Sequence, residues 1–531
     1  MNLNTKTKIL LPTIVAASIV VGMITHKVLF QKFYANAPSN FTGNKLNELL
    51  KTVVENYVDT LYYDSLVEKT IPTLIEQLDP HSIYIPAKDR EAVDEPIRGN
   101  FEGIGIQFNI RNDTVHVINT ISGGPSEKVG IRGGDRIVKV NDTVVAGVKI
   151  TNDQIMSKLK GPKGTKVKVT IARPGIDKPL DFEIIRDKIP IYSVETGYLI
   201  RPKTGYIKID RFSMNTYREF IEKVKLLKKD GARQFIIDLR GNGGGVMQDA
   251  IQIADEFLSA GKIIVYTQGQ ARPRFDFYSS ARGLLQNDPL VILIDEFSAS
   301  ASEILAGAIQ DNDRGTIVGR RSFGKGLVQE PIYFKDGSEL RLTVARYYTP
   351  TGRCIQKPYD NEEDYTKDIL RRFQRGEFKA VDSIKLNEND KYYTPAGKVV
   401  YGGGGIMPDI FVPIDTSQSS KFTLEAQQRG LEYQFSYDFA DKHRNELSAF
   451  TDPQKLELHL DKINIISTFA AFAVSKNIKA NDFNTQPADK YYVKQIKALI
   501  IRNILGDSVY YRIMNEIDPT VNKALEVLNQ Q

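Results

Sequence analysis

The stretch Leu290-Val-Ile-Leu-Ile-Asp-Glu-Phe-Ser-Ala-Ser-Ala-Ser-Glu303 places an apolar run directly before a serine-rich turn and a helical pattern. Five consecutive apolar residues bounded by turn residues predict a buried strand. Ser300-Ala-Ser-Glu303 fits a capping box, in which a serine caps the start of a helix and a glutamate three residues later accepts a hydrogen bond from the backbone of that serine. The stretch therefore predicts a strand, a tight turn and a helix.

The same alternation extends to both sides of this stretch. Strands are predicted at residues 205–209, 234–239, 263–267 and 316–318, and helices at 216–229, 247–258 and 300–310. Such alternation predicts an α/β layer fold. Farther on, Leu327–Phe334 and Glu339–Tyr348 are joined through Lys335-Asp-Gly337 and predict a β-hairpin.

Changes of pattern divide the chain into five regions. They are an N-terminal membrane anchor or signal segment (1–37), a helical region (38–98), a β-rich domain with frequent turn signals (99–187), the α/β core (188–414) and a C-terminal helical region (415–531). The core contains a charge-rich insertion at about 356–396, which is predicted to be exposed. The fold class is thus multidomain α/β, with an inserted β-rich domain and flanking helical regions.

The N-terminus contains the uncharged run Ile9–Thr25, preceded by Lys6 and Lys8. A run of this length lies at the short limit for a membrane span. Ala35-Asn-Ala37 resembles a signal-peptide cleavage site, but it lies well past the run, with lysines between. An uncleaved anchor is therefore favoured, and a cleaved, secreted form is the alternative. Both place the rest of the chain outside the cytoplasm, in a bacterial periplasm or cell envelope.

Composition excludes several classes of function. The net charge of +6 is spread over 531 residues, and no Lys/Arg cluster interleaves with aromatics, so nucleic acid is not expected as a partner. A single cysteine, Cys354, excludes a disulfide scaffold and a cysteine-based zinc site. Gly319–Gly326 nearly matches a phosphate loop, but Gly326 stands where a hydroxyl residue should hold magnesium. We expect neither a metal nor a cofactor.

Ser300 and Lys325 are the candidate nucleophile and base. The usual base for a serine is histidine, but none of the five histidines lies between residues 117 and 442. Lysine is the other base known to serve such a serine. Apolar and glycine neighbours of Lys325 favour desolvation, which lowers the pKa of an amine. Gln329, four residues on, returns to the same face and is a candidate for orienting the amine. Ser298 and Ser302 remain rival nucleophiles on spacing alone.

Two glycine-containing segments are candidates for binding. Gly241-Asn-Gly-Gly-Gly245 follows a predicted strand and can donate N–H groups to an oxyanion, unless it is only a tight turn. Phe101-Glu-Gly-Ile-Gly-Ile-Gln-Phe108 places glycines before a strand, where backbone N–H groups can hold a terminal carboxylate while the strand edge pairs with a peptide. An ordinary turn is the alternative.

Together these residues resemble the C-terminal processing peptidases, also called tail-specific proteases, over about residues 45–413. The motifs that carry the resemblance occur in order: Leu78-Asp-Pro-His-Ser82, Phe101-Glu-Gly-Ile-Gly105, Gly205-Tyr-Ile207, Asp238-Leu-Arg-Gly-Asn-Gly-Gly-Gly245, Ser298-Ala-Ser-Ala-Ser-Glu303, Ala306-Gly307, Gly324-Lys-Gly326 and Gly405-Ile-Met-Pro-Asp-Ile410.

The resemblance implies a role for particular residues. The separation of 25 positions in the family's serine–lysine pair selects Ser300, given Lys325, and its third residue matches Gln329. It further implies oxyanion donors at the backbone of Ala301 and of Gly244 or Gly245, and a supporting acidic residue at Asp311. Residues 100–186 would form a PDZ domain whose carboxylate site is Gly103, Ile104, Gly105 and Ile106.

The function implied is that of a serine endopeptidase that captures the C-terminal tails of protein substrates through its PDZ domain. Cleavage would use a Ser-Lys-Gln site and an acyl-enzyme, without a cofactor. We expect a membrane attachment through the N-terminal segment, and helical regions on both sides of the core make a homodimer plausible. The alternative is a catalytically silent PDZ scaffold that only binds peptides, which a proteolysis assay would distinguish.

Overall fold

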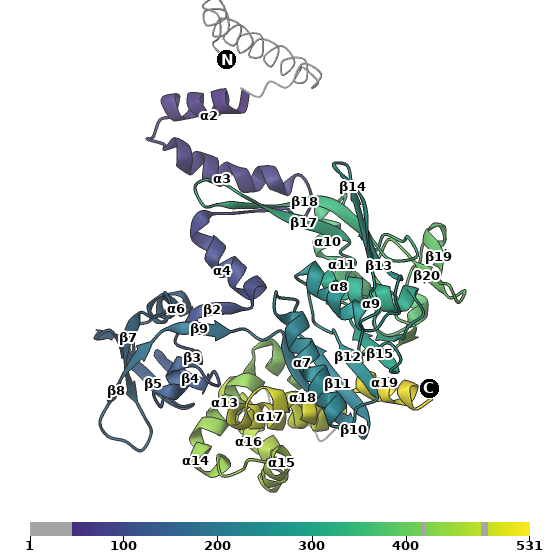
Figure 1. Cartoon of the computed structure of the whole chain (residues 1–531). Helices are drawn as coiled ribbons and strands as arrows, with labels where there is room; N and C mark the ends of the chain where they lie inside the picture. Colours follow the sequence, from purple (N-terminus) through teal and green to yellow (C-terminus); the bar gives the residue numbers. More distant parts are fainter. Residues whose placement is uncertain (1–44, 416–419, 479–486, 531) are drawn as a thin grey trace, which may run out of the picture. The chain divides into compact units, whose positions relative to one another are not determined.

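The computed structural model describes residues 45–415, 420–478 and 487–530, and the chain divides into two compact units, residues 1–77 and 78–531. In the first unit, α2 (Lys45–Asn56) and α3 (Tyr63–Glu76) are helices, as their apolar spacing predicts (Figure 1). The expected anchor or signal segment, residues 1–37, lies outside the described residues. Within the described ranges, no helix is long and apolar enough to span a bilayer.

A six-stranded sheet forms the centre of the α/β core. Its order is β10 (Val194–Arg201), β11 (Thr204–Ile209), β12 (Gln234–Asp238), β15 (Leu290–Ile294), β16 (Thr316–Gly319) and β21 (Ile410–Phe411). The β10–β11 pair is antiparallel and the other pairs are parallel. Every residue of β15 is buried, which explains its continuous apolar run, because a central parallel strand is covered on both faces.

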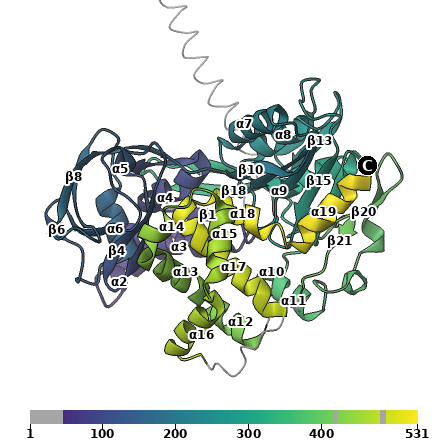
Figure 2. The same ribbon diagram turned by 90° about the horizontal axis from the view of Figure 1, so that it is seen from below.

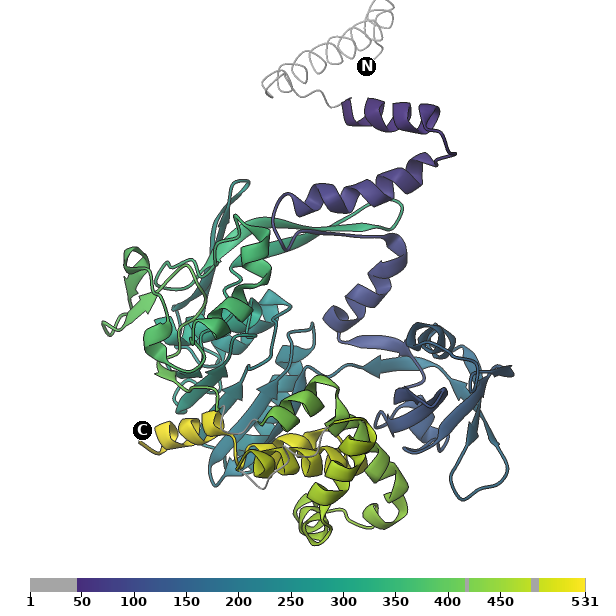
Figure 3. The same cartoon turned by 180° about the vertical axis from the view of Figure 1, so that it is seen from behind.

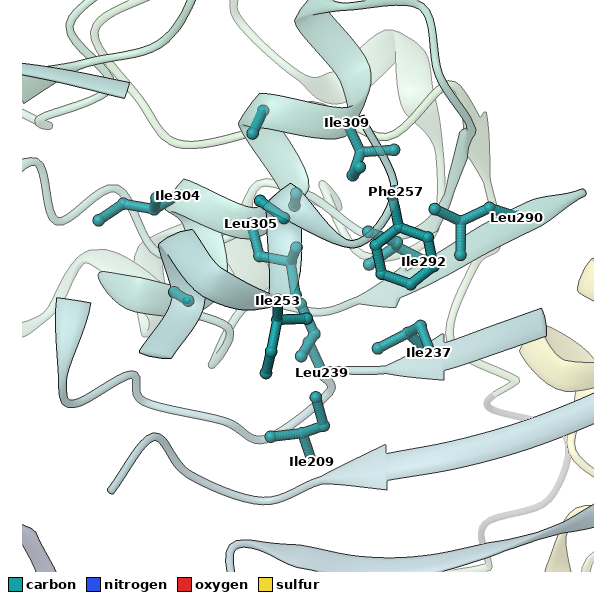
Figure 4. Close-up of a cluster of buried hydrophobic side chains, with 14 of the residues drawn as sticks. Ile209, Ile237, Leu239, Ile253, Phe257, Leu290, Ile292, Ile304, Leu305 and Ile309 are labelled. Atoms are coloured by element: carbon teal, nitrogen blue, oxygen red, sulfur yellow. The ribbon is translucent and has the colours of Figure 1, made fainter. Parts of the chain in front are cut away.

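One face of this sheet is covered by three helices. They are α7 (Thr216–Lys229), α8 (Met247–Asp255) and α9 (Ala301–Asp311), and each follows a strand as the sequence predicts. Figure 4 shows Leu305 and Ile309 of α9 in the same core as Ile237 and Ile292 of the strands. The strand, turn and helix predicted at residues 290–303 are thereby confirmed, and burial of α9 fixes where the turn before it must lie.

The opposite face of the sheet is covered by the last helix, α19 (Pro519–Gln530). Val521, Leu525 and Leu528 pack with residues from four strands, namely Tyr206, Ile236, Val291, Leu293 and Val318. The helix, drawn in yellow beside β15 in Figure 2, packs against β15 and β16. Helical spacing predicts a helical C-terminal region, but it does not reveal that the final helix completes the α/β core.

A second sheet stands beside the first. It contains β13 (Ile263–Gly269), β14 (Arg272–Tyr278), β17 (Leu327–Tyr333), β18 (Glu339–Tyr348) and the short β1 (Ile83–Ile85). The predicted hairpin is confirmed as β17 and β18, in which Gln329 lies opposite Thr343. Because β1 pairs with β18, the segment that begins at Leu78 and leads into β1 lies beside the hairpin.

The β-rich domain is enclosed by two strands that pair with each other, β2 (Asn100–Gly103) and β9 (Asp187–Pro190). α4 (Ala87–Arg98) leads into β2. Inside, the sheet order is β3 (Ile106–Arg111), β4 (Thr114–Thr120), β5 (Arg136–Val140), β7 (Lys166–Ala172) and β8 (Leu180–Ile185), with β6 (Thr143–Val144) beside β5. Two helices, α5 (Pro125–Lys128) and α6 (Asn152–Leu159), complete it, and Ile155 and Leu159 of α6 lie in its apolar core.

Phe435 and Phe469 are among the aromatic residues of a further apolar core, in the C-terminal region. The described helices that form this core are drawn in yellow-green to yellow in Figure 3. They are α12 (Lys421–Gln428), α13 (Leu431–Lys442), α14 (Arg444–Leu447), α15 (Pro453–Lys462), α16 (Ile465–Ser475), α17 (Pro487–Leu505) and α18 (Ser508–Met514). On α13, Asp438 and Asp441 pair with two arginines of the β-rich domain, Arg111 (2.7 Å) and Arg136 (2.6 Å).

Most of the charged insertion is exposed, as predicted, but one part of it is buried. It contains α10 (Glu362–Thr366), α11 (Asp368–Gln374) and a small antiparallel pair, β19 (Lys391–Tyr393) with β20 (Val399–Tyr401). Arg372 of α11 is only 1% exposed and donates to the backbone carbonyls of Arg321 and Ser322. Its charge is balanced by Glu377, which also pairs with Arg321. Paired charges allow this polar segment to be buried, and it supports the chain just before Lys325.

Shortening Leu528 to alanine should test whether α19 is part of the core. Leu528 is buried between α19 and the sheet, so Leu528→Ala should lower the free energy of unfolding by about 2–5 kcal/mol, the usual cost of such a cavity. Asn529→Ala, at an exposed neighbouring position, is the control and should change it by less than about 0.5 kcal/mol. Denaturant unfolding would measure both, and equal small effects would place α19 outside the cooperative core.

Candidate active site

Ser300 occupies a strained turn between β15 and α9. Its backbone has φ 56° and ψ −114°, a conformation that residues with a side chain rarely adopt and that costs on the order of 1–3 kcal/mol. The amide of Glu303 donates to the carbonyl oxygen of Ser300 (2.9 Å). The helix start is therefore secured through the backbone of Ser300, and its hydroxyl is not needed for that bond.

The carboxylate of Glu303 ties the two candidate residues together. Its Oε2 accepts the amide N–H of Ser300 (2.8 Å) and the amide N–H of Lys325 (2.9 Å). Its Oε1 accepts the Ser322 hydroxyl (2.5 Å) and the Gly324 amide (2.7 Å). The side chain is completely buried, and this burial raises its pKa to about 7 against the opposing effect of the four donors.

Tyr347 holds the same two segments by their carbonyls. Its hydroxyl contacts the carbonyl oxygen of Lys325 at 2.5 Å and that of Ser300 at 3.1 Å. Burial raises the pKa of this phenol well above its ordinary value, so the hydroxyl stays protonated and can donate. Sequence reasoning missed Tyr347, because nothing in the predicted strand Glu339–Tyr348 marks which of its aromatic residues turns toward the serine.

Lys325 lies two residues before β17, with its amine largely enclosed. Burial lowers the pKa of Lys325 from its ordinary value, and the charges of Asp79 and Glu303 oppose this shift without reversing it. The amine donates to the side-chain oxygen Oε1 of Gln329 at 3.0 Å. The contact expected between Lys325 and Gln329 is thus present. Because the amine is the donor in this bond, the bond does not use the nitrogen lone pair of the neutral amine.

A cavity of about 690 Å³ brings the predicted residues together. Ser300, Lys325 and Gln329 line it, and so do Gly244 and Gly245 of the glycine turn. Much of the remaining wall is apolar, formed by Ile97, Met214, Val246, Met247, Ile304, Leu327, Val328 and Pro331. Apolar walls with a few convergent polar groups are typical of a site that binds a substrate.

The two rival serines, Ser298 and Ser302, use their hydroxyls in buried hydrogen bonds to the backbone. Ser298 is buried, and its hydroxyl donates to the carbonyl oxygen of Leu239 at 2.9 Å. Ser302 is also buried, and its hydroxyl donates to the carbonyl oxygen of Asn242 at 2.9 Å. Of the three serines, only Ser300 lines the cavity.

The glycine turn is pressed against Ser300. A Cβ on Gly244 would lie 2.7 Å from the Cβ of Ser300, so a side chain cannot be accommodated there. The amide of Gly244 donates to the side-chain oxygen of Asn242 (2.8 Å), which leaves Gly245 as the stronger candidate for an oxyanion donor. Ala301, the other candidate, is the first residue of α9, where backbone N–H groups are not used within the helix.

The strand before the glycine turn ends in a buried ion cluster. Arg240 pairs with Asp238 (2.6 Å) and with Asp518, which precedes α19 (2.8 Å). Burial would raise the pKa of Asp238, but Arg240 and Lys208 hold it well below its usual range. The cluster thereby anchors the start of the glycine turn to the C-terminal helix, a contact that sequence patterns did not predict.

Asp311 is not brought to the cavity. It lies at the end of α9, buried, where it pairs with Arg353 at 2.6 Å and accepts the hydroxyl of Thr351. Its place is therefore structural support behind the helix that carries Ser300. No cluster of three or more potential metal ligands occurs in the described part of the chain.

The glycine segment of the β-rich domain forms a fixed loop at the sheet edge. The carbonyl oxygen of Ile104 accepts both the amide (3.0 Å) and the hydroxyl (2.7 Å) of Ser126. Gly105 has a φ of 73°, which a side chain would strain, and it connects Gly103 of β2 to Ile106 of β3. Since β3 pairs only with β4 among the described strands, its other edge is available for an added strand.

Replacing Glu303 by glutamine should change how stability depends on pH. The pKa of Glu303 is about 7 when folded and near 4.5 when unfolded, so its protonation stabilises the fold below pH 4.5 and this contribution is lost as pH rises through 7. Glu303→Gln does not titrate, and its NH2 group would face N–H donors, so the variant should be less stable than wild type at pH 5. The difference in unfolding free energy between wild type and variant should shrink by roughly 3 kcal/mol by pH 8, as measured by denaturant unfolding. A difference that stays constant or grows would contradict the raised pKa of Glu303.

Comparison with known proteins gives three matches to protein families. Residues 203–366 match peptidase family S41, residues 103–184 match the PDZ domain, and residues 422–506 match a family of unknown function. The first two coincide with the α/β core that holds Ser300 and with the β-rich domain.

The chain is also similar to whole proteins. It is 36% identical to the carboxy-terminal-processing protease of Bartonella bacilliformis over 319 residues, covering 59% of this chain and 72% of that protein. It is 34% identical to the carboxy-terminal processing protease CtpA of Bacillus subtilis, covering 66% and 74%. Among solved structures, the photosystem II D1 C-terminal processing protease has 24% identity and a TM-score of 0.35, covering 69% of this chain and 92% of that chain.

Identity of this extent, over more than two thirds of curated proteases, confirms the resemblance seen in the sequence motifs. The chain belongs to peptidase family S41, the carboxy-terminal processing proteases, and contains a PDZ domain.

Proposed function

We propose that this protein cleaves peptide bonds with Ser300 as nucleophile and Lys325 as general base, on substrates captured by their C-terminal tails. The observation that supports the proposal is that a serine on a strained turn and a largely enclosed lysine line the same cavity of about 690 Å³. The lowered pKa of Lys325 supports its role, because only the neutral amine can accept a proton.

The chemistry follows from these positions. The amine of Lys325 takes the proton of the Ser300 hydroxyl as the oxygen attacks the substrate carbonyl carbon. The resulting ammonium returns the proton to the leaving amine as the tetrahedral intermediate collapses to an acyl-enzyme. A water molecule then gives a proton to the same amine and attacks the ester carbonyl carbon. The bond to the Ser300 oxygen breaks, the ammonium of Lys325 returns the proton to that oxygen, and the new C-terminus is released.

The intermediate needs donors for its negative oxygen. We assign these to the amide of Ala301 at the start of α9 and to the glycine turn, at Gly245 rather than Gly244, whose N–H is already bound by Asn242. Gln329 keeps the amine of Lys325 oriented, and Asp311 supports α9 from behind. None of these steps uses a metal or a cofactor.

The PDZ domain is proposed to bind the substrate's tail. Gly103, Ile104, Gly105 and Ile106 would hold the terminal carboxylate, while the tail pairs with the available edge of β3. This would retain a substrate while another part of it enters the cavity.

Location and assembly are proposed from the N-terminal part. The uncharged run Ile9–Thr25 would anchor the chain, with the catalytic part outside the cytoplasm, unless the segment is cleaved. In residues 45–77, Leu46 and Leu49 are about half exposed, and a second copy of the chain would cover such apolar side chains in a homodimer.

Removing either reacting group should abolish proteolysis. Ser300→Ala and Lys325→Ala should each lower kcat by at least about 100-fold on an unfolded protein substrate, because each removes a group from the reaction. Lys335→Ala, at an exposed lysine in the turn of the same hairpin, is the control and should be as active as wild type. For wild type, kcat/KM should rise with pH as the amine becomes neutral and level off below the ordinary lysine pKa. Wild-type rates in Lys325→Ala would refute the assignment of the base.

Blocking the terminal carboxylate should weaken capture. Two substrates that differ only by a C-terminal amide should show KM values about tenfold apart, the factor that loss of one charge-assisted contact implies, with similar kcat. A chain with the PDZ glycine replaced, Gly105→Val, should lose this difference because its loop cannot hold the carboxylate. Equal KM values for the two substrates on the wild-type chain would count against tail capture.

A further inference from the structure

The turn Asp79-Pro-His-Ser82 reaches the candidate site from outside the α/β core. It directly precedes β1, which pairs with β18 of the hairpin. At the turn, the backbone carbonyl oxygen of His81 accepts a hydrogen bond from the side-chain Nε2 of Gln329. The other end of the same amide, Oε1, accepts from the amine of Lys325 at 3.0 Å. Gln329 therefore bridges the turn and the lysine.

The oxygen and the NH2 group of the Gln329 side-chain amide have opposite effects on the amine of Lys325 when that amine acts as a base. When Oε1 faces the amine, Lys325 donates to it and the nitrogen lone pair remains available for a proton. With the amide reversed, the NH2 group would donate into that lone pair and occupy it. A backbone carbonyl can only accept hydrogen bonds, so the carbonyl of His81 selects the first orientation: reversal would place two oxygen acceptors against each other.

Asp79 fixes the position of this carbonyl. Its Oδ1 accepts the amides of His81 and Ser82, both at 2.8 Å, and the hydroxyl of Thr343 at 3.1 Å. Its Oδ2 accepts a hydrogen bond from the hydroxyl of Ser82 at 2.6 Å. The Ser82 hydroxyl oxygen in turn accepts one from the amide of Thr343 at 3.0 Å. Because Thr343 lies directly opposite Gln329 across β17 and β18, the turn and the glutamine are anchored to the same place.

The side chain of His81 adds no charge to the site. Its ring contacts the hydroxyl of Tyr365 through Nε2 at 2.5 Å. Burial and the neighbouring Lys325 lower the pKa of His81 to about 4, so the ring is neutral at the pH where the amine of Lys325 must lose its proton. A protonated imidazole there would face two lysines, Lys325 and Lys357.

We propose that the turn Asp79–Ser82 is a positioning element of the active site, which sets the orientation of the Gln329 amide and so keeps the lone pair of Lys325 available. This inference rests on the proposed function of Ser300 and Lys325. The turn does not line the cavity and positions the amine through Gln329, while the charge of Asp79 separately opposes the lowering of the Lys325 pKa. Thr343 is the residue through which it can be tested, since its hydroxyl holds Asp79 without adding charge near the amine.

Thr343→Val removes that hydroxyl and keeps the shape of the side chain. It should lower kcat about tenfold with little change in KM. It should also alter the low-pH limb of the kcat/KM profile, because the NH2 group of a reversed Gln329 amide would occupy the lone pair of Lys325 that otherwise binds a proton. Thr343→Ser, which restores the hydroxyl, should recover the wild-type rate. Thr196→Val, at a buried threonine of β10 in the other sheet, is the matched control and should leave kcat unchanged.

A double-mutant cycle separates action through Gln329 from general loss of stability. Once Gln329→Met has removed the amide, adding Thr343→Val should cost less than about twofold more in kcat. If the two losses multiply in full, or if folded Thr343→Val keeps the wild-type kcat and pH profile, the inference is overturned. Ser300→Ala in the same assay reports on the proposed function by itself: activity that persists in it refutes that function, whatever the behaviour of Thr343.

Discussion

The buried carboxylate of Glu303 is the constraint on which the rest of the site depends. It accepts the backbone amides of Ser300 and Lys325, two residues that are 25 positions apart and lie in the turn after β15 and in the loop before β17. Tyr347 makes the complementary contact with their carbonyl oxygens. A strained serine can persist only where its surroundings over-determine its conformation, and these two side chains supply that surrounding structure from opposite sides of the backbone.

Support for the site comes from parts of the chain that are remote in sequence. Arg372 of the insertion binds the carbonyls just before Lys325, Asp518 ahead of α19 binds Arg240 before the glycine turn, and the turn at Asp79 binds the hairpin that carries Gln329. Each contact uses a charged group that is at least partly buried and is held by an ion pair or by hydrogen bonds, an arrangement that is costly unless the geometry is fixed. Fixed geometry is also what a proton transfer between serine and lysine requires.

The two sheets contribute different residues to the cavity in which binding and chemistry are proposed. The parallel sheet ends in the turns that hold Ser300 and the glycines, where ligands of open α/β sheets usually bind. The hairpin brings Lys325, Gln329 and an apolar wall against them. Burial then lowers the pKa of the amine, so that the packing of the core and the proposed proton transfer depend on the same contacts.

The sequence alone determined the local elements: the buried strand β15, the turn, α9, the hairpin and the glycine segments, because apolar periodicity and glycine placement are set by neighbours along the chain. It also named Ser300, Lys325 and Gln329, although from the residues alone Ser298 and Ser302 remained open. Only the tertiary structure decided that those two serines bind backbone carbonyls, that Tyr347 and His81 belong beside the site, and that α19 completes the core. These facts join residues separated by tens to hundreds of positions, and side-chain packing, which leaves no periodic trace in the sequence, determines them.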